Sequence, residues 1–170
     1  FHFSRAGEVR PGQARTFRSP IFQPCAGRMI AVLVNSFIDK AQAFYESIGI
    51  GPWTPYPPLT EYEELDVPSR EGFVSLKYRI CNLPNVQFQL CEPGEASSPQ
   101  RLHLDHKGEG VFHIGFEVPD ADAAEDEART QGLPVLMRGR RANRTGFTYY
   151  DSADLAGVTL LTRATNRPGQ

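Results

Sequence analysis

A buried strand, an amphipathic helix and then further strands occur twice along this chain, and this repeat restricts its fold more than any other feature. In the first pass, the apolar run MIAVLVN over residues 29–35 is typical of a buried strand. Apolar residues at helical spacing follow over 37–48, and Gly49 ends the predicted helix. Strand-like runs come next, over 53–56, 72–80 and 86–91.

The second pass keeps the same order of elements. Residues 111–118 form a strand-like run, and Asp120 or Asp122 is placed to cap a helix that extends to Gln131. Further strand-like runs cover 135–138, 146–151 and 158–162. This order predicts an α+β fold in which paired βαβββ modules form a curved, cup-shaped mixed β-sheet.

The modules set the expected domain boundaries. We expect one domain over residues 21–164, with modules at about 21–93 and 108–164. Residues 1–20 are rich in arginine, but their glycines and Pro11 oppose an amphipathic helix, so we expect an extension that is flexible or packed on the domain. Residues 165–170 are polar and are expected to form a flexible tail.

Composition excludes several classes of protein. The formal net charge of −2 argues against a nucleic-acid-binding domain, and no apolar run approaches the length of a membrane span. An odd number of cysteines (Cys25, Cys81 and Cys91) does not make a disulfide framework, so we expect free thiols in a reducing compartment and a cytoplasmic location.

Strand alternation places several polar residues on one face of the sheet. His113 and Glu117 alternate with apolar neighbours, so they lie on the face that the module's helix does not cover. By the same alternation, Gln89 shares a face with Gln87, and Leu161 shares one with Arg163. Such a mixed face suits a sheet that curves around a small-molecule cavity, or an antiparallel sheet with one face in water.

Four separated stretches carry a family resemblance. They are FYESIGIGPW (44–53), VQFQLCEP (86–93), GEGVFHIGFEV (108–118) and the closing pair FTYYDS (147–152) and AGVTLL (156–161). Together they resemble the vicinal oxygen chelate superfamily, in its glyoxalase and methylmalonyl-CoA epimerase-like branch, over about residues 21–163. The resemblance implies the cup-shaped fold of the glyoxalase/bleomycin-resistance type, and it implies a homodimer.

The resemblance also implies a divalent metal in the cup, held by one side chain from each of four strands. Gln89 and His113 fall on two of these positions, whereas the position usually held by glutamate is Leu161. The first-strand position falls at Met29 or Ile30, or at Gln23 if that strand begins earlier. A histidine with neutral amides is a poor site for Mg²⁺, Mn²⁺ or Zn²⁺. We therefore expect no cofactor; a metal, if bound, would be held by Gln23, Gln89 and His113.

The function that follows is an isomerase or lyase acting on a small carbonyl compound through an enol or enolate. The proton-transfer glutamate of the epimerase branch would lie in residues 72–80, which instead carry Ser75 and Lys77. We expect catalytic roles for His113, Glu117 and Tyr150, and substrate contacts from Gln23, Gln89, Tyr78 and Leu161. The alternative is a non-catalytic protein that binds a small molecule in the same cavity, as drug-sequestering members of the superfamily do.

One basic run remains. Residues 138–144 (RGRRANR) could bind a phosphate or a carboxylate, or could form a solvated hairpin.

Overall fold

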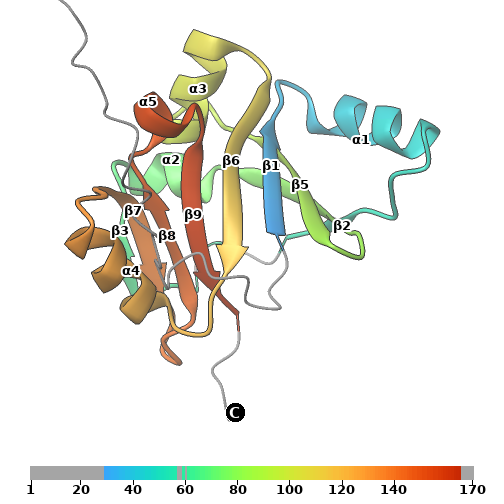
Figure 1. Ribbon diagram of the computed structural model, residues 1–170. Helices are drawn as coiled ribbons and strands as arrows, with labels where there is room; N and C mark the ends of the chain where they lie inside the picture. Colours follow the sequence, from blue (N-terminus) through green and yellow to red (C-terminus); the bar gives the residue numbers. More distant parts are fainter. Residues whose placement is uncertain (1–28, 57–58, 60, 166–170) are drawn as a thin grey trace, which may run out of the picture.

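A computed structural model describes residues 29–56, 59 and 61–165, and a single curved nine-stranded sheet dominates it (Figure 1). The strands are β1 (Met29–Val34), β2 (Thr54–Pro55), β3 (Glu64–Asp66), β4 (Lys77–Asn82), β5 (Val86–Glu92), β6 (Gly110–Glu117), β7 (Val135–Arg140), β8 (Gly146–Tyr150) and β9 (Thr159–Ala164). The helices are α1 (Ile38–Ser47), α2 (Arg70–Val74), α3 (Pro99–Lys107), α4 (Ala121–Thr130) and α5 (Ala153–Ala156).

The strand order shows the predicted duplication directly. It runs β2-β4-β5-β1-β6-β9-β8-β7-β3. The first strand of each module pairs in parallel with its last, β1 with β5 and β6 with β9, and the antiparallel pair β1–β6 joins the modules. The predicted fold of paired βαβββ modules is therefore confirmed. Residues 1–28 and 166–170 lie outside the described residues, and with them the predicted extension, the start of the domain at 21 and nearly all of the predicted tail.

The module helices form where the sequence predicts them, and each relies on a carboxylate at its first turn. The side chain of Asp120 accepts hydrogen bonds from the backbone N–H groups of Asp122 (2.9 Å) and Ala123 (3.0 Å) and so caps α4. Phe37 cannot cap α1, and Glu92 from β5 accepts the Ile38 N–H instead, at 2.9 Å. None of the helices in the described part of the chain is long and apolar enough to cross a membrane.

Between β2 and β4 one prediction is wrong and one strand was missed. Residues 70–74 form helix α2 rather than the start of a strand, because Ser69 caps this turn by accepting the Gly72 N–H at 3.0 Å. The helix also packs against the chain at Ser97, whose carbonyl oxygen would lie 1.9 Å from a Cβ at Gly72, so only glycine fits. The three-residue strand β3 was not predicted, because it lies in a stretch with no clear period.

The chain between β2 and β3 passes from one end of the sheet to the other. β2 pairs with β4 at the first-module end, whereas β3 pairs with β7 at the second-module end. Tyr62, which precedes β3, packs edge-on against Phe147 of β8 with ring centroids 5.1 Å apart. Phe73 of α2 stacks on the same ring at 5.6 Å. The described residues of this crossing segment, Leu59 and 61–63, together with α2 therefore cover the concave face of the sheet, opposite α4 (Figure 1).

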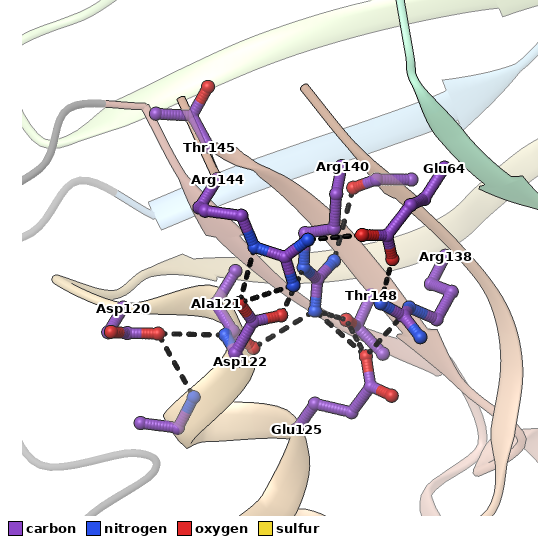
Figure 2. Close-up of polar contacts among 12 residues, drawn as sticks. Glu64, Asp120, Ala121, Asp122, Glu125, Arg138, Arg140, Arg144, Thr145 and Thr148 are labelled. Atoms are coloured by element: carbon purple, nitrogen blue, oxygen red, sulfur yellow. Dashed lines mark hydrogen bonds and ion pairs between the residues drawn. The ribbon is translucent and has the colours of Figure 1, made fainter. Parts of the chain in front are cut away.

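A buried arginine fixes α4 to the second module (Figure 2). Arg140 of β7 is fully buried and donates to Asp122 and Glu125 of α4, both at 2.8 Å, and to Thr148 of β8 at 3.0 Å. It also donates to three backbone carbonyls, those of Ala121, Gly139 and Phe147. A buried charge is tolerated only when it is paired and hydrogen-bonded in this way.

We predict that Arg140→Met lowers the free energy of unfolding by about 3–5 kcal/mol, because it removes the buried cation that joins Asp122 and Glu125 and leaves three backbone carbonyls without this donor. Arg101→Met, which removes an arginine from a surface ion pair within α3, is the control and should change stability little. Urea unfolding of both variants checks this. Equal losses would show that the network contributes no more than a surface pair.

Candidate functional site

A cavity of about 70 Å³ lies on the concave face and is shared by both modules. Its walls are mostly aromatic, and side chains of the sheet form its floor. The side chains that line it include Ile30, Tyr56, Leu59, Tyr62, Phe73, Tyr78, Gln89, His113, Arg141, Phe147, Tyr149, Leu161 and Arg163. Among these described lining residues there is no carboxylate, so the cavity carries positive rather than negative charge.

The pseudo-symmetry of the modules relates four positions on the cavity floor as two equivalent pairs. Gln89 of β5 pairs with the β1 residue that lies two positions after Ile30. Leu161 of β9 likewise pairs with the β6 residue that lies two positions after His113. Ile30 is thus the first-module equivalent of His113, and Gln89 is the equivalent of Leu161. Of the first-strand candidates, Ile30 lines the cavity, Met29 is 43% exposed, and Gln23 lies outside the described residues.

These four positions do not fit the divalent metal that the family resemblance implies. Two of them are aliphatic, and the side chains of Leu161 and Ile30 crowd the same point above Gly115, within 2.5 and 3.2 Å of a Cβ placed there. Only one imidazole and one neutral amide remain as donors, whereas a zinc site has at least three protein ligands and a magnesium site has one or two carboxylates. No group of three or more histidine, cysteine, aspartate or glutamate side chains suited to a metal occurs among the described residues.

His113 is the chemically distinctive group of the floor. Its side chain is 1% exposed, and its Nδ1 atom is buried with no hydrogen-bond partner. Its ring stands edge-on to Tyr149, with centroids 4.7 Å apart. Burial, assisted by the nearby charge of Arg163, lowers the pKa of His113 to about 3. The imidazole is therefore neutral at physiological pH and keeps a free hydrogen-bonding position.

Two tyrosine hydroxyls lie beside it, and that of Tyr78 is hydrogen-bonded to Tyr149 and Cys91. Tyr78 and Tyr149 both line the cavity, and burial raises the pKa of each phenol well above its usual value. Both hydroxyls therefore stay protonated at neutral pH. Gln100 of α3 is fully buried and donates to the Tyr78 hydroxyl at 3.4 Å, so the linker between the modules reaches this wall.

The structure brings together four of the predicted site residues: Tyr78, Gln89, His113 and Leu161 all line the cavity. Glu117 does not line it; its carboxylate pairs with Arg163 at 3.1 Å. Tyr150 also lies elsewhere, because its side chain points to the opposite face, under α4, where its hydroxyl lies 2.8 Å from that of Thr162. The adjacent Tyr149 faces the cavity instead.

The cavity residues that the sequence did not reveal come from the crossing segment between β2 and β3, from α2 and from the β7–β8 hairpin. Tyr56, Tyr62 and Phe73 reach the cavity because the chain crosses the concave face, and no periodic pattern indicates that path. Arg141 belongs to the basic run, for which a bound anion was one of two open interpretations.

We predict that His113 makes folding stability fall in acid. Its folded pKa lies below the unfolded value near 6.5, so the unfolded state binds the extra proton. The stabilisation is complete above pH 6.5 and is lost as the pH falls toward about 3, by about 1.4 kcal/mol per pH unit. Urea unfolding at pH 7 and pH 5 should show a smaller decrease for His113→Gln than for the wild type. Parallel decreases would contradict the lowered pKa.

Comparison with known structures finds the same fold in enzymes. Methylmalonyl-CoA epimerase in complex with methylmalonyl-CoA and NH4+ is 21% identical, with a TM-score of 0.63 over 84% of this chain and 99% of that one. The Mycobacterium tuberculosis methylmalonyl-CoA epimerase is 18% identical, with a TM-score of 0.59 over 82% and 87%. A Streptomyces coelicolor epimerase variant with 2-nitronate-propionyl-CoA is 21% identical, with a TM-score of 0.61 over 80% and 94%.

At these identities the likeness shows the fold alone, and no curated protein matches the chain significantly. A family model gives the stronger result. The model described as Glyoxalase/Bleomycin resistance protein/Dioxygenase superfamily matches residues 30–150, which span both modules and three of the four floor positions. The match covers well over half of the chain and agrees with the paired modules of the sheet. The chain therefore belongs to the glyoxalase/bleomycin resistance protein/dioxygenase superfamily, the vicinal oxygen chelate superfamily that its sequence motifs resemble.

Proposed function

We propose that this chain is an isomerase- or lyase-type enzyme that acts on a small enolisable carbonyl compound, and that side chains rather than a metal hold the enolate. The observation that carries this proposal is His113, a buried neutral imidazole with an unpartnered Nδ1 at a cavity that also presents Gln89 and two protonated tyrosines. Fixed donors in a site that excludes water stabilise a developing oxyanion more than water does.

In this mechanism the hydroxyl of Tyr149, which is hydrogen-bonded to Tyr78, donates to the carbonyl oxygen as negative charge develops on it. His113 removes the proton from the adjacent carbon, since no described carboxylate lines the cavity to do so. A pKa of about 3 makes the free imidazole a weak base. The negative charge of the enolate opposes both causes of that low pKa, because it favours the imidazolium and offsets the charge of Arg163. His113 therefore becomes a stronger base as the reaction proceeds.

Cavity size supports a small substrate. Pockets for drug-sized ligands measure roughly 300–1,000 Å³. The cavity here is about 70 Å³, enough for a few non-hydrogen atoms at the reacting end of a molecule. A longer substrate would have to extend beyond the cavity.

We predict that the protein catalyses exchange of solvent deuterium into the α-carbon of at least one of 2-oxobutanoate, butan-2-one and propionyl N-acetylcysteamine thioester, as followed by proton NMR. His113→Gln should reduce the rate by about a hundredfold or more, because a positioned general base contributes roughly 10²–10⁴. The matched control is His106→Gln, at an exposed position on α3, which should exchange like the wild type. Equal exchange by both variants would exclude His113 as the base.

We also predict that EDTA leaves the exchange rate unchanged and that added Mn²⁺, Co²⁺ or Zn²⁺ does not raise it, because two of the four floor positions are aliphatic. The double variant Ile30→His/Leu161→Glu restores polar donors and should gain a thermal shift with Zn²⁺ that the parent lacks. A stoichiometric metal in the parent protein would refute this prediction.

One observation favours a second function, small-molecule binding without chemistry. The only imidazole that lines the described cavity is weakly basic before a ligand binds, and no described carboxylate can replace it. Saturable binding of a small ligand with no deuterium exchange in any of the three probes would favour this alternative.

We propose further that the protein acts as a homodimer in the cytoplasm. The exposed Phe37, Phe44 and Ile48 on and beside α1 support self-association, and the free Cys81 and Cys91 agree with a reducing compartment.

A further inference from the structure

The four arginines of the basic run 138–144 have different partners. Three of them meet carboxylates: Arg138 lies 2.9 Å from Glu64, Arg140 pairs with Asp122 and Glu125, and Arg144 pairs with Asp122 and Glu64 (Figure 2). Arg141 forms no ion pair with any residue in the described part of the chain. The run is therefore partly structural, and one of its guanidinium groups has no carboxylate partner among the described residues.

Arg141 is nevertheless held in place rather than loose in solvent. Its guanidinium carbon lies 4.5 Å from the centre of the Tyr62 ring, and its Nη2 donates to the Tyr62 hydroxyl at 3.3 Å. Its backbone N–H donates to the Thr145 carbonyl at 2.8 Å, which closes the β7–β8 hairpin. Stacking on an aromatic face leaves the edge of a guanidinium free to make two parallel hydrogen bonds.

Arg141 also lines the cavity, and nothing described there balances its charge. The second arginine of the cavity, Arg163, is already paired with Glu117 and donates to Gln87 at 2.9 Å. No described carboxylate lines the wall. A half-buried cation without a counter-charge, beside apolar aromatic rings, is a site that an anionic ligand completes.

We propose that Arg141 binds the carboxylate of the substrate, so that the substrate class is a small organic acid with an apolar body. This inference rests on the proposed function for the reacting end of the molecule. The carboxylate lies at the guanidinium, the apolar body packs on Tyr62 and Phe147, and the carbonyl group reaches toward His113. Arg141 is thereby the residue that selects acids over neutral carbonyl compounds.

A phosphate can also make two parallel hydrogen bonds with a guanidinium, but the surroundings favour a carboxylate. The planar fork of Arg141 matches a planar carboxylate with two hydrogen bonds. Tyr62, Phe73 and Phe147 offer apolar faces rather than the backbone N–H groups that phosphate sites use, and the second arginine of the cavity is already paired with Glu117. The cavity volume of about 70 Å³ also suits a short acid.

The test compares acids with their neutral amides. Binding of 2-oxobutanoate and 2-oxobutanamide, and of benzoate and benzamide, is measured by calorimetry or ligand-observed NMR. At least one acid should bind the wild type about ten- to a hundredfold more tightly than its amide, the range for hydrogen bonds to a charged group. Arg141→Gln should remove this preference, and Arg141→Lys should retain part of it. Arg144→Gln, the same charge change within the hairpin, should keep it.

Three results would overturn the proposal: no preference for either acid, an unchanged preference in Arg141→Gln, or inorganic phosphate binding more tightly than both acids at the same residue. Its failure can be told from that of the proposed function. Deuterium exchange into butan-2-one without any preference for acids would support the proposed enzyme and contradict carboxylate binding by Arg141. A preference for acids that depends on Arg141, without deuterium exchange, would support carboxylate binding by Arg141 and contradict the proposed enzyme.

Discussion

The antiparallel pairing of β1 with β6 is the contact on which the rest of this molecule depends. Neither βαβββ module encloses a cavity by itself, since each supplies only half of the curved sheet. The pairing brings Ile30 and Gln89 of one module to the same floor as His113 and Leu161 of the other. It also leaves the concave face open to the crossing segment, which pairs with the far edge of the sheet and closes the cavity with aromatic side chains. The site is therefore a product of module pairing, and a separated module would not contain it.

Aliphatic side chains at two of the four floor positions determine the chemistry of this floor. A bound cation would supply positive charge and keep water nearby. Here Ile30 and Leu161 hold two of the floor positions, and burial together with the charge of Arg163 lowers the pKa of His113 to about 3. The positive charge comes instead from Arg163, which is tied to Glu117, and from Arg141, which is tied only to a ring and a hydroxyl. The electrostatics of the cavity thus rest on side chains, and the floor offers hydrogen bonds instead of coordination.

The sequence predicts the parts of this arrangement that follow from period and order. Alternation along β5, β6 and β9 places Gln89, His113 and Leu161 on the concave face, because strands leave little freedom in side-chain direction. Alternation also separates Tyr149 from Tyr150, but it cannot say which of two aromatic neighbours meets the helix. The partners of Arg141 are beyond prediction for another reason. They depend on β3, a three-residue strand from the first module that pairs with the second, and local sequence carries no signal for so distant a contact.

Charge couples the two ends of the cavity. His113 stays neutral because burial and the nearby charge of Arg163 lower its pKa, and Arg141 adds a second positive charge to the same cavity. A carboxylate bound at Arg141 adds negative charge to the cavity, so protonation of His113 costs less when the ligand is present than when it is absent. By linkage, protonation of His113 must then strengthen ligand binding by the same factor. The imidazole therefore gains basicity where and when an acid occupies the site, and the free protein keeps it unprotonated.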